Sequence, residues 1–305
     1  MTGGAAGTTG GAHTTGVRSD GFRLMGILNV TPDSFSDGGR YLRREAALEH
    51  GARMLAEGAD IVDVGGESTR PGARPVSAAQ ELARVGPVID GLAAAHPGAC
   101  ISIDTSKASV ARAALDAGAS FVNDVSALRA DPEMAALVAA SGAQCCLMHM
   151  QGEPRTMQLE PRYADVVDEV KAFLHERLSF AVRAGVCEQQ VLLDPGIGFG
   201  KTLEHNLELL RRLGELRALG RPIVIGTSRK SFLGRIAASS RGRAEPVGVG
   251  ARLPGTLASS VLAFERGASV FRVHDVGPVR EALAVAAATL GSRWPARSTA
   301  KTPTS

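Results

Sequence analysis

The sequence lacks the cysteine spacing that marks zinc and redox sites. It contains four cysteines, and no two of them form a C-x-x-C pair. We therefore expect buried free thiols in a reducing compartment and no disulfide framework. Cys145 and Cys146 are adjacent within an apolar run, so in a strand their side chains would point to opposite faces.

Long apolar stretches and signal-like segments are also missing. No run approaches the roughly 18 apolar residues of a membrane-spanning helix, so we expect no membrane partner. Residues 1–21 are rich in Gly, Ala and Thr without the apolar core of a secretory signal, and residues 292–305 are polar and interrupted by proline. Both segments are predicted to be disordered tails, and the protein is predicted to be cytoplasmic.

Basic and acidic residues are nearly equal in number. Lys and Arg number 34 and Asp and Glu 31, which gives a net charge of +3 at pH 7. Because basic and acidic residues are interspersed, the sequence predicts no surface for a phosphate backbone, and we expect no nucleic-acid partner. The H-E-x-x-H and G-x-S-x-G motifs of zinc proteases and serine hydrolases are absent from the chain.

One pattern is present and repeated: a short apolar run stops at a polar residue, and an amphipathic segment follows. The eight runs are residues 24–29, 61–64, 101–104, 121–125, 144–149, 191–194, 223–226 and 270–274. Continuous apolar strands joined by helices are typical of a parallel sheet covered on its outer face. Eight units favour a single (β/α)8 TIM barrel over residues 22–291, because a doubly wound sheet usually has about six strands. The Gly- and Pro-rich stretches after the first two runs predict long mobile loops.

The active site of a TIM barrel lies at the carboxyl ends of its strands. The polar residues at these ends include Asp104, Asn123 and Asp194, and Lys230 follows the seventh strand. Two carboxylates, an amide and an ammonium suit a flat heterocycle that carries neighbouring N–H donors and a carbonyl. An alternative stays open, in which Asp194 and Lys230 form a simple salt bridge and Asn123 caps a loop.

A second set of residues at the same end suits a phosphate ester. It consists of Asn29, Thr69, Arg70, Arg272 and His274. Arg272 and His274 are two apart, so they share a strand face, although a single histidine at a strand end can equally be structural. A hard cation such as Mg²⁺ could take an amide oxygen together with ligand oxygens. One protein ligand would make this a weak metal site.

Two other motifs are misleading. The run from Gly196 to Thr202 resembles a Walker A loop, but it has three residues where that motif needs four before Gly-Lys-Thr. Lys230 could be a Schiff-base lysine, yet the neighbouring Arg229 and the lack of a dedicated acid–base pair disfavour this interpretation.

Eight segments together resemble the dihydropteroate synthase family of folate biosynthesis. They are NVTPDSFSDGG, DVGGESTRPGA, SIDTSK, the pair Asn123-Asp124, LMHMQGEPRTMQ, LLDPGIGFGKT, GTSRKSFLG and RVHDV, and the resemblance runs over residues 25–291. It implies condensation of 6-hydroxymethyl-7,8-dihydropterin diphosphate with p-aminobenzoate, with Mg²⁺ as cofactor and a homodimer as the assembly. It also implies an SN1-like step in which diphosphate leaves before the arylamine attacks.

The resemblance implies a role for each matching residue. The pterin would contact Asp104, Asn123, Met148, Asp194, Phe199 and Lys230, and the diphosphate Asn29, Thr69, Arg70, Arg272 and His274, with Asn29 as the metal ligand. The p-aminobenzoate would contact Phe35, Pro71, Phe199 and Ser231. Asn29, Asp37, Lys230, Arg272 and His274 would be the catalytic residues. Two rivals remain: a pterin-dependent corrinoid methyltransferase, which needs no diphosphate site, and a pterin-binding paralogue without catalysis.

Overall fold

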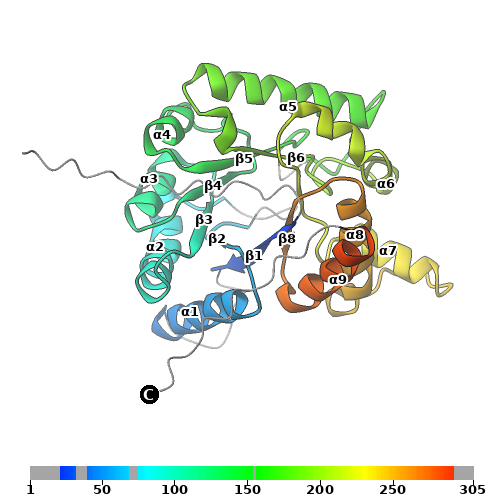
Figure 1. Ribbon diagram of the computed structural model, residues 1–305, viewed down its shortest axis with the longest axis horizontal. Coiled ribbons are helices and arrows are strands. Elements are labelled where there is room, and N and C mark those ends of the chain that lie inside the picture. Colours follow the sequence, from blue (N-terminus) through cyan, green and yellow to red (C-terminus); the bar gives the residue numbers. More distant parts are fainter. Residues whose placement is uncertain (1–20, 32–39, 69–74, 154–155, 292–305) are drawn as a thin grey trace, which may run out of the picture.

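The computed structural model of the protein describes residues 21–31, 40–68, 75–153 and 156–291. It confirms the (β/α)8 barrel: eight parallel strands form one sheet in the order β6-β5-β4-β3-β2-β1-β8-β7 (Figure 1). The strands are β1 (Arg23–Asn29), β2 (Ile61–Gly65), β3 (Cys100–Asp104), β4 (Phe121–Asp124), β5 (Gln144–Met148), β6 (Val191–Asp194), β7 (Val224–Ile225) and β8 (Val270–Val273). An isolated parallel bridge between Leu193 and Ile223 joins β6 to β7 and closes the barrel.

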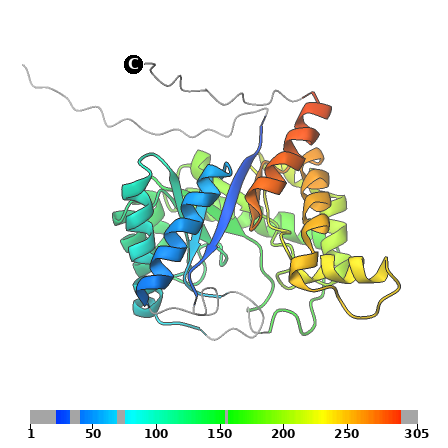
Figure 2. The ribbon, with the colours of Figure 1, turned by 90° about the horizontal axis from the view of Figure 1, so that it is seen from below.

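Helices surround the strands on the outside of the barrel (Figures 1 and 2). They are α1 (Arg40–Ala56), α2 (Ala78–Ala95), α3 (Ala108–Asp116), α4 (Met134–Ser141), α5 (Val166–Arg183), α6 (Leu203–Arg211), α7 (Ser231–Ser239), α8 (Leu253–Glu265) and α9 (Val276–Thr289). Short 3-10 helices occupy Glu188–Gln190, Leu213–Leu219 and Val249–Ala251. Among the helices of the described segments, none is both long enough and apolar enough to span a membrane.

Local sequence accounts for where several helices begin. At the head of α2, Ser77 forms a capping box with Gln80. Asp131 lies three residues before α4, and its carboxylate accepts from the N–H of Glu133 and from that of Ala108 in α3. The Asp131 side chain therefore holds two neighbouring helices instead of capping one.

The core has two parts, one on each side of the sheet. Between strands and helices lies a large apolar layer, and inside the barrel lies a smaller plug that includes Met25, Phe121 and Cys146. Cys145 belongs to the outer layer, so the two adjacent thiols do point to opposite faces. All four cysteines are free, but Cys187 is exposed, which corrects the expectation that every thiol is buried.

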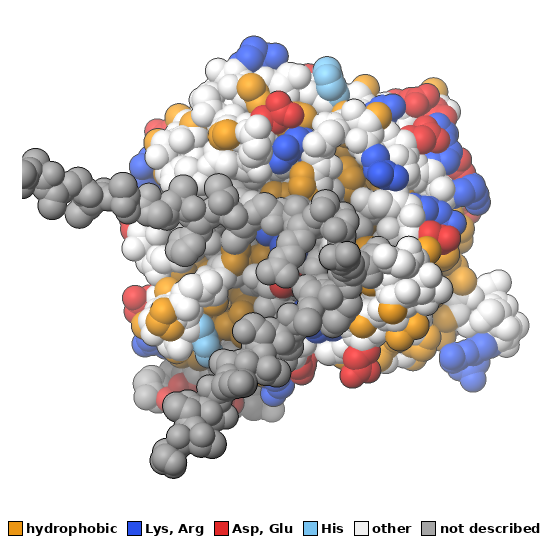
Figure 3. Space-filling view, in the orientation of Figure 1, with side chains coloured by type: hydrophobic (Ala, Val, Ile, Leu, Met, Phe, Trp, Pro, Cys, Tyr) orange, Lys and Arg blue, Asp and Glu red, His pale blue; other side chains and the backbone are white. Residues whose placement is uncertain are grey.

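The barrel interior changes from apolar to polar toward the carboxyl ends of the strands. In β2 the inward positions alternate, so that Ile61 belongs to the plug and Asp63, two residues later, belongs to a polar network with Ser102 of β3. This polar end, at the lower edge of the view in Figure 2, is the mouth of the barrel. On the face shown in Figure 3, acidic and basic side chains are interspersed over the surface, in line with the low net charge.

Candidate active site

Asp63 is the centre of a buried hydrogen-bond network inside the barrel. Its carboxylate accepts from Ser102 Oγ at 2.6 Å, from Asn123 Nδ2 at 2.9 Å and from Arg272 Nε at 2.6 Å. The side chain is fully buried, so these charge-assisted bonds replace water around the carboxylate. The network joins β2, β3, β4 and β8 and orients two of the expected ligand-binding side chains, Asn123 and Arg272.

Arg272 connects this network to Asp104. Its Nη2 lies 2.6 Å from Asp104 Oδ2, so one guanidinium bridges two carboxylates. Burial alone would lower the pKa of Arg272, but Asp63 and Asp104 raise it above its ordinary value, so the side chain stays a cation. Burial raises the pKa of Asp104 to about 7, although the nearby guanidinium lowers it. Arg272 was expected at the diphosphate, and the structure places two of its nitrogens on the interior carboxylates.

Asp194 is the last residue of β6, and Lys230, in the loop after β7, is the N-cap residue of α7. Asp194 Oδ1 accepts from the Gly196 N–H at 2.7 Å, while Lys230 Nζ donates to the Ile197 carbonyl and lies 4.7 Å from the centre of the Phe199 ring. Burial raises the pKa of Asp194, and Lys230 opposes that rise. Burial likewise lowers the pKa of Lys230 to about 8. The two charges influence each other without a direct ion pair among the described contacts, which leaves both able to bind a ligand.

An apolar wall adjoins these charged groups. Met148, Met150 and Met157 form a buried cluster against which Phe199 and Val125 pack. Methionine side chains are polarizable and adapt to the faces of flat rings. The wall and the carboxylates together provide both an apolar face and N–H acceptors for a planar heterocycle.

The loop between β6 and α6 is held from below by a buried lysine. Lys201 Nζ lies 2.8 Å from His149 Nδ1 and donates to the Phe199 carbonyl at 3.0 Å. Burial and, to a smaller extent, the charge of Lys201 lower the pKa of His149 to about 3, so the imidazole is neutral and accepts the bond. At Gly196, where φ is +66°, an added Cβ would lie 1.8 Å from the His149 carbonyl oxygen. The false Walker motif therefore serves to hold this loop against β5.

His274 lies at the rim, directly after β8. Its Nδ1 is 3.0 Å from Ser228 Oγ, and its backbone N–H donates to the same oxygen at 3.1 Å. The residues that follow Ser228 and His274 in the chain also form a pair, since Arg229 Nε lies 2.9 Å from Asp275 Oδ2. Two consecutive residues after β7 thus bind two consecutive residues after β8.

The structure places the expected site residues unevenly. Asn29, Asp104, Asn123, Met148, Asp194, Phe199, Lys230, Arg272 and His274 all lie at the carboxyl ends of strands or in the loops that follow. Ser231 is the exposed first residue of α7. Phe35, Asp37, Thr69, Arg70 and Pro71 lie outside the described residues. The base of the second loop is described, and there Lys107 forms ion pairs with Glu67 and Glu81.

The side-chain amide oxygen of Asn29 is of the kind that a hard cation binds. Its amide oxygen lies beside Gly65 and Asp104, since a Cβ added at Gly65 would be 3.8 Å from Asn29 Oδ1 and 3.6 Å from Asp104 Oδ2. Over the described residues, no group of three His, Cys, Asp or Glu side chains could enclose a metal. Amide and carboxylate oxygens beside an open mouth fit Mg²⁺, which commonly keeps one or two protein ligands and takes the rest from phosphate and water.

Three functional residues were not singled out from the sequence. Asp63 lies within an apolar strand, and a charge at an inward position was the signal that could have identified it. Lys201 was set aside with the Walker-like motif. Ser228 follows the seventh strand, and its contact with His274 depends on the pairing of β7 with β8.

Comparisons with known proteins agree with this geometry. The family model described as pterin binding enzyme matches residues 25–274, from β1 to the histidine that follows β8. A dihydropteroate synthase of Mycobacterium leprae is 51% identical over 269 residues, which cover 88% of this chain and 93% of that protein. A structure of the Yersinia pestis dihydropteroate synthase in a sulfonamide drug complex superposes with a TM-score of 0.84 at 42% identity, covering 92% of this chain and 98% of that one.

A further structure, of the Xanthomonas albilineans dihydropteroate synthase, holds 7,8-dihydropteroate. It superposes with a TM-score of 0.79 at 43% identity and covers 90% of this chain and 95% of that one. The family match spans most of the chain, and the relatives match along nearly their whole length. This chain therefore belongs to the dihydropteroate synthase family of pterin-binding enzymes.

Proposed function

We propose that the protein is a transferase that condenses 6-hydroxymethyl-7,8-dihydropterin diphosphate with p-aminobenzoate. The bond between the methylene carbon and the diphosphate oxygen breaks, and diphosphate leaves with the electron pair. The arylamine nitrogen then bonds to the carbon and loses a proton, which gives 7,8-dihydropteroate. The observation that carries this proposal is that one barrel mouth holds buried carboxylates, an apolar wall and a rim histidine within a chain that resembles these enzymes throughout.

The pterin is proposed to bind between the two carboxylates and the apolar wall. Asp104 and Asp194 accept from N–H groups of the ring, Asn123 and Lys230 bind its remaining polar edge, and Met148 and Phe199 cover a face. A buried carboxylate that accepts two N–H bonds discriminates strongly against rings lacking them, because it would otherwise stay unpaired. The raised pKa of Asp194, caused by burial, is consistent with a carboxylate that awaits such a ligand.

The chemical step is proposed to be SN1-like. Lys230 and the phenyl ring of Phe199 exclude water near the pterin, and His274 donates a hydrogen bond to the departing diphosphate. The arylamine is a weak nucleophile, so its placement beside the methylene carbon contributes more than removal of its proton. Ser231 at the N-terminus of α7 is proposed to bind the carboxylate of p-aminobenzoate, helped by the helix dipole.

Mg²⁺ is proposed as the cofactor, with Asn29 as its protein ligand. When bound, the ion would offset negative charge on the diphosphate. Arg272 is also proposed to contact the diphosphate, through N–H groups that remain after its Nε binds Asp63 and its Nη2 binds Asp104.

The test is the formation of 7,8-dihydropteroate and diphosphate from the two purified substrates, measured by chromatography. Product formation is expected and would exclude both a corrinoid methyltransferase and a non-catalytic paralogue. His274→Ala is expected to lower the rate of diphosphate release more than the affinity for pterin. Pterin binding without product would overturn the proposed activity.

We also propose a cytoplasmic homodimer. The four free cysteines suit a reducing compartment. Large apolar side chains are exposed on the C-terminal helices, with Leu262 44% exposed on α8 and Val285 68% exposed on α9. Sedimentation equilibrium is expected to give twice the chain mass of 31.6 kDa, and a monomer at micromolar concentration would contradict this assembly.

A further inference from the structure

The contact between Ser228 and His274 limits the protonation states of the histidine. A serine hydroxyl has one hydrogen to donate and two lone pairs that accept. The backbone N–H of His274 is always a donor, so at 3.1 Å it occupies one lone pair of Ser228 Oγ. The hydroxyl hydrogen remains, and among the described residues the imidazole Nδ1, 3.0 Å away, is the acceptor within reach.

This arrangement distinguishes the three forms of the imidazole. If Nδ1 is unprotonated, the Ser228 hydroxyl donates to it, and every donor in the contact has an acceptor. If Nδ1 carries a proton, as in the other neutral tautomer or in the imidazolium, two donors point at one oxygen and the hydroxyl hydrogen loses its acceptor. Ser228 is buried, so such a loss costs free energy.

The backbone around Ser228 is held in place by a second pair of residues. Arg229 has a φ of +58°, a left-handed conformation that a long side chain adopts only when its surroundings stabilise it. Its guanidinium forms a two-pronged ion pair with Asp275, and its carbonyl accepts from Arg252 Nη1 at 2.9 Å. The Arg229–Asp275 pair therefore maintains the Ser228–His274 distance independently of the hydroxyl itself.

We infer that Ser228 is a positioning residue that fixes His274 as the neutral tautomer with its proton on Nε2. Ring geometry places Nε2 on the edge away from Ser228. A neutral imidazole with an Nε2–H donates to an anionic oxygen and cannot act there as a base. The consequence for catalysis rests on the proposed function, in which that oxygen belongs to the departing diphosphate.

The tautomer is tested directly by ¹⁵N NMR of histidine-labelled protein without substrate. His274→Gln identifies the resonances among the seven histidines. At pH 7.5 we expect an unprotonated Nδ1 and a protonated Nε2 in the wild type and in Ser228→Thr, which keeps the hydroxyl. In Ser228→Ala we expect loss of this preference, with a mixture of the two tautomers. A wild-type spectrum showing Nδ1–H or the imidazolium would overturn the inference. This measurement on the wild type does not depend on whether any variant folds.

The matched control is Ser259→Ala. Ser259 is also a buried serine beside the same loop, but its hydroxyl donates to Thr227 Oγ1 at 2.8 Å and not to His274. This variant should retain the wild-type spectrum, and a tautomer change in it would show that any loss of a hydroxyl here has the same effect, against the inference.

Kinetics give a second readout. Ser228→Ala is expected to lower kcat about tenfold, with the dissociation constant of the pterin within about twofold, because one hydrogen bond to the rim histidine is lost. An unchanged kcat together with the altered tautomer would overturn the positioning role. If no variant and no wild-type sample forms product, the proposed function fails, and the spectrum alone still decides the tautomer.

Discussion

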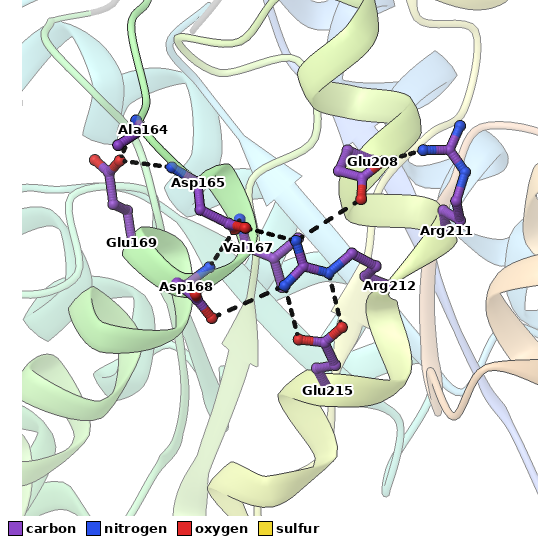
Figure 4. A network of polar contacts seen from close by, with 9 residues as sticks. All are labelled: Ala164, Asp165, Val167, Asp168, Glu169, Glu208, Arg211, Arg212 and Glu215. Carbon is purple, nitrogen blue, oxygen red and sulfur yellow. Dashed lines mark hydrogen bonds and ion pairs between the residues drawn. The ribbon is translucent and has the colours of Figure 1, made fainter.

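Two arginines organise charged networks in this protein, one inside the barrel and one outside. Arg272 bridges Asp63 and Asp104, whose side chains are 0% and 9% exposed. Arg212, after α6, reaches Asp165, Asp168, Glu208 and Glu215, whose side chains are 33–70% exposed (Figure 4). The outer network has more ion pairs, and it links α6 to the N-terminus of α5.

The comparison teaches that burial, not the number of ion pairs, decides what such a network does. Water screens the outer charges and competes for their hydrogen bonds, so each pair there contributes little. The inner charges have lost their water, so each one depends on its partner. A buried charged side chain that depends on its ion-pair partner is held in one position. A ligand-binding site requires side chains fixed in this way.

The largest effect is expected from Asp63→Ala. This change leaves the Arg272 guanidinium with one carboxylate and removes the acceptor of Ser102 and Asn123, and breaking a buried pair typically costs about 3–5 kcal/mol. Urea unfolding should show a large loss of stability, with loss of product formation. Glu215→Ala in the outer network, which removes a 44% exposed carboxylate bound to Arg212, is the matched control and should unfold close to the wild type. Equal stability of the two variants would break the distinction between inside and outside.

A second variant distinguishes the buried charged side chains that stabilise the fold from those that are proposed to bind the ligand. Asp194 accepts one hydrogen bond from the Gly196 N–H, so its removal frees few internal partners. We expect Asp194→Ala to weaken pterin binding by about 100-fold or more, through loss of two charge-assisted bonds, while the protein stays folded. Calorimetric titration with pterin measures this directly. Unchanged affinity would remove Asp194 from the pterin site.

The pH dependence should also differ between the two networks. Burial raises the pKa of Asp104 from 3.8 to about 7, so its protonated form favours the fold, and this contribution to stability is lost as pH rises through 7. A ligand that donates N–H bonds needs the carboxylate, so pterin affinity should fall about tenfold per pH unit below 7. Hydrogen bonds from Arg212 lower the pKa of Asp165 and that of Glu215, so these two outer carboxylates should not titrate in this range.

Calorimetry in two buffers of different ionisation enthalpy checks this pH effect. We expect proton release on pterin binding at pH 6.5 and little at pH 8.5. Proton uptake at pH 6.5 would mean that Asp104 is protonated in the complex. Asp104 would then donate a hydrogen bond to the pterin, contrary to its proposed role as an acceptor.

The smallest effect is expected from Arg212→Ala. Although this residue pairs with four carboxylates, they are solvated, and we expect a slight change in the urea midpoint that disappears in 0.5 M salt. A salt-independent loss as large as that of Asp63→Ala would show that solvation does not separate the two networks.

The sequence was sufficient to predict the barrel and the residues around its mouth. Apolar runs give the strands, and parallel strands bring all their carboxyl ends to one edge, so Asp104, Asn123 and Asp194 could be grouped without knowing which strands are neighbours. The limits of the strands differ from prediction by at most one residue at either end. The last polar residue of each run was the useful signal.

Contacts between side chains could not be predicted in the same way. The contact of Arg272 with Asp63 depends on the registers of β8 and β2 against β1, which lies between them. These registers place Arg272 level with Met25 and Ile61, so its long side chain reaches Asp63 two positions further along β2. The role of Lys201 depends on the path of the loop that brings it to His149. Such contacts come from pairing and loop geometry, which local composition does not contain.

The junction of β6 with β7 has a consequence for how the enzyme responds to its ligand. Strand β7 is two residues long, and the bridge from Leu193 to Ile223, with the Leu193 N–H donating to the Pro222 carbonyl at 3.0 Å, completes the wall there. Asp194 lies on one side of this junction, at the end of β6, and Lys230 lies on the other side, in the loop after β7. A pterin ring bound by both side chains would link the two sides of this short junction. Ligand binding should therefore slow amide hydrogen exchange at Leu193 more than at other strand residues of the barrel.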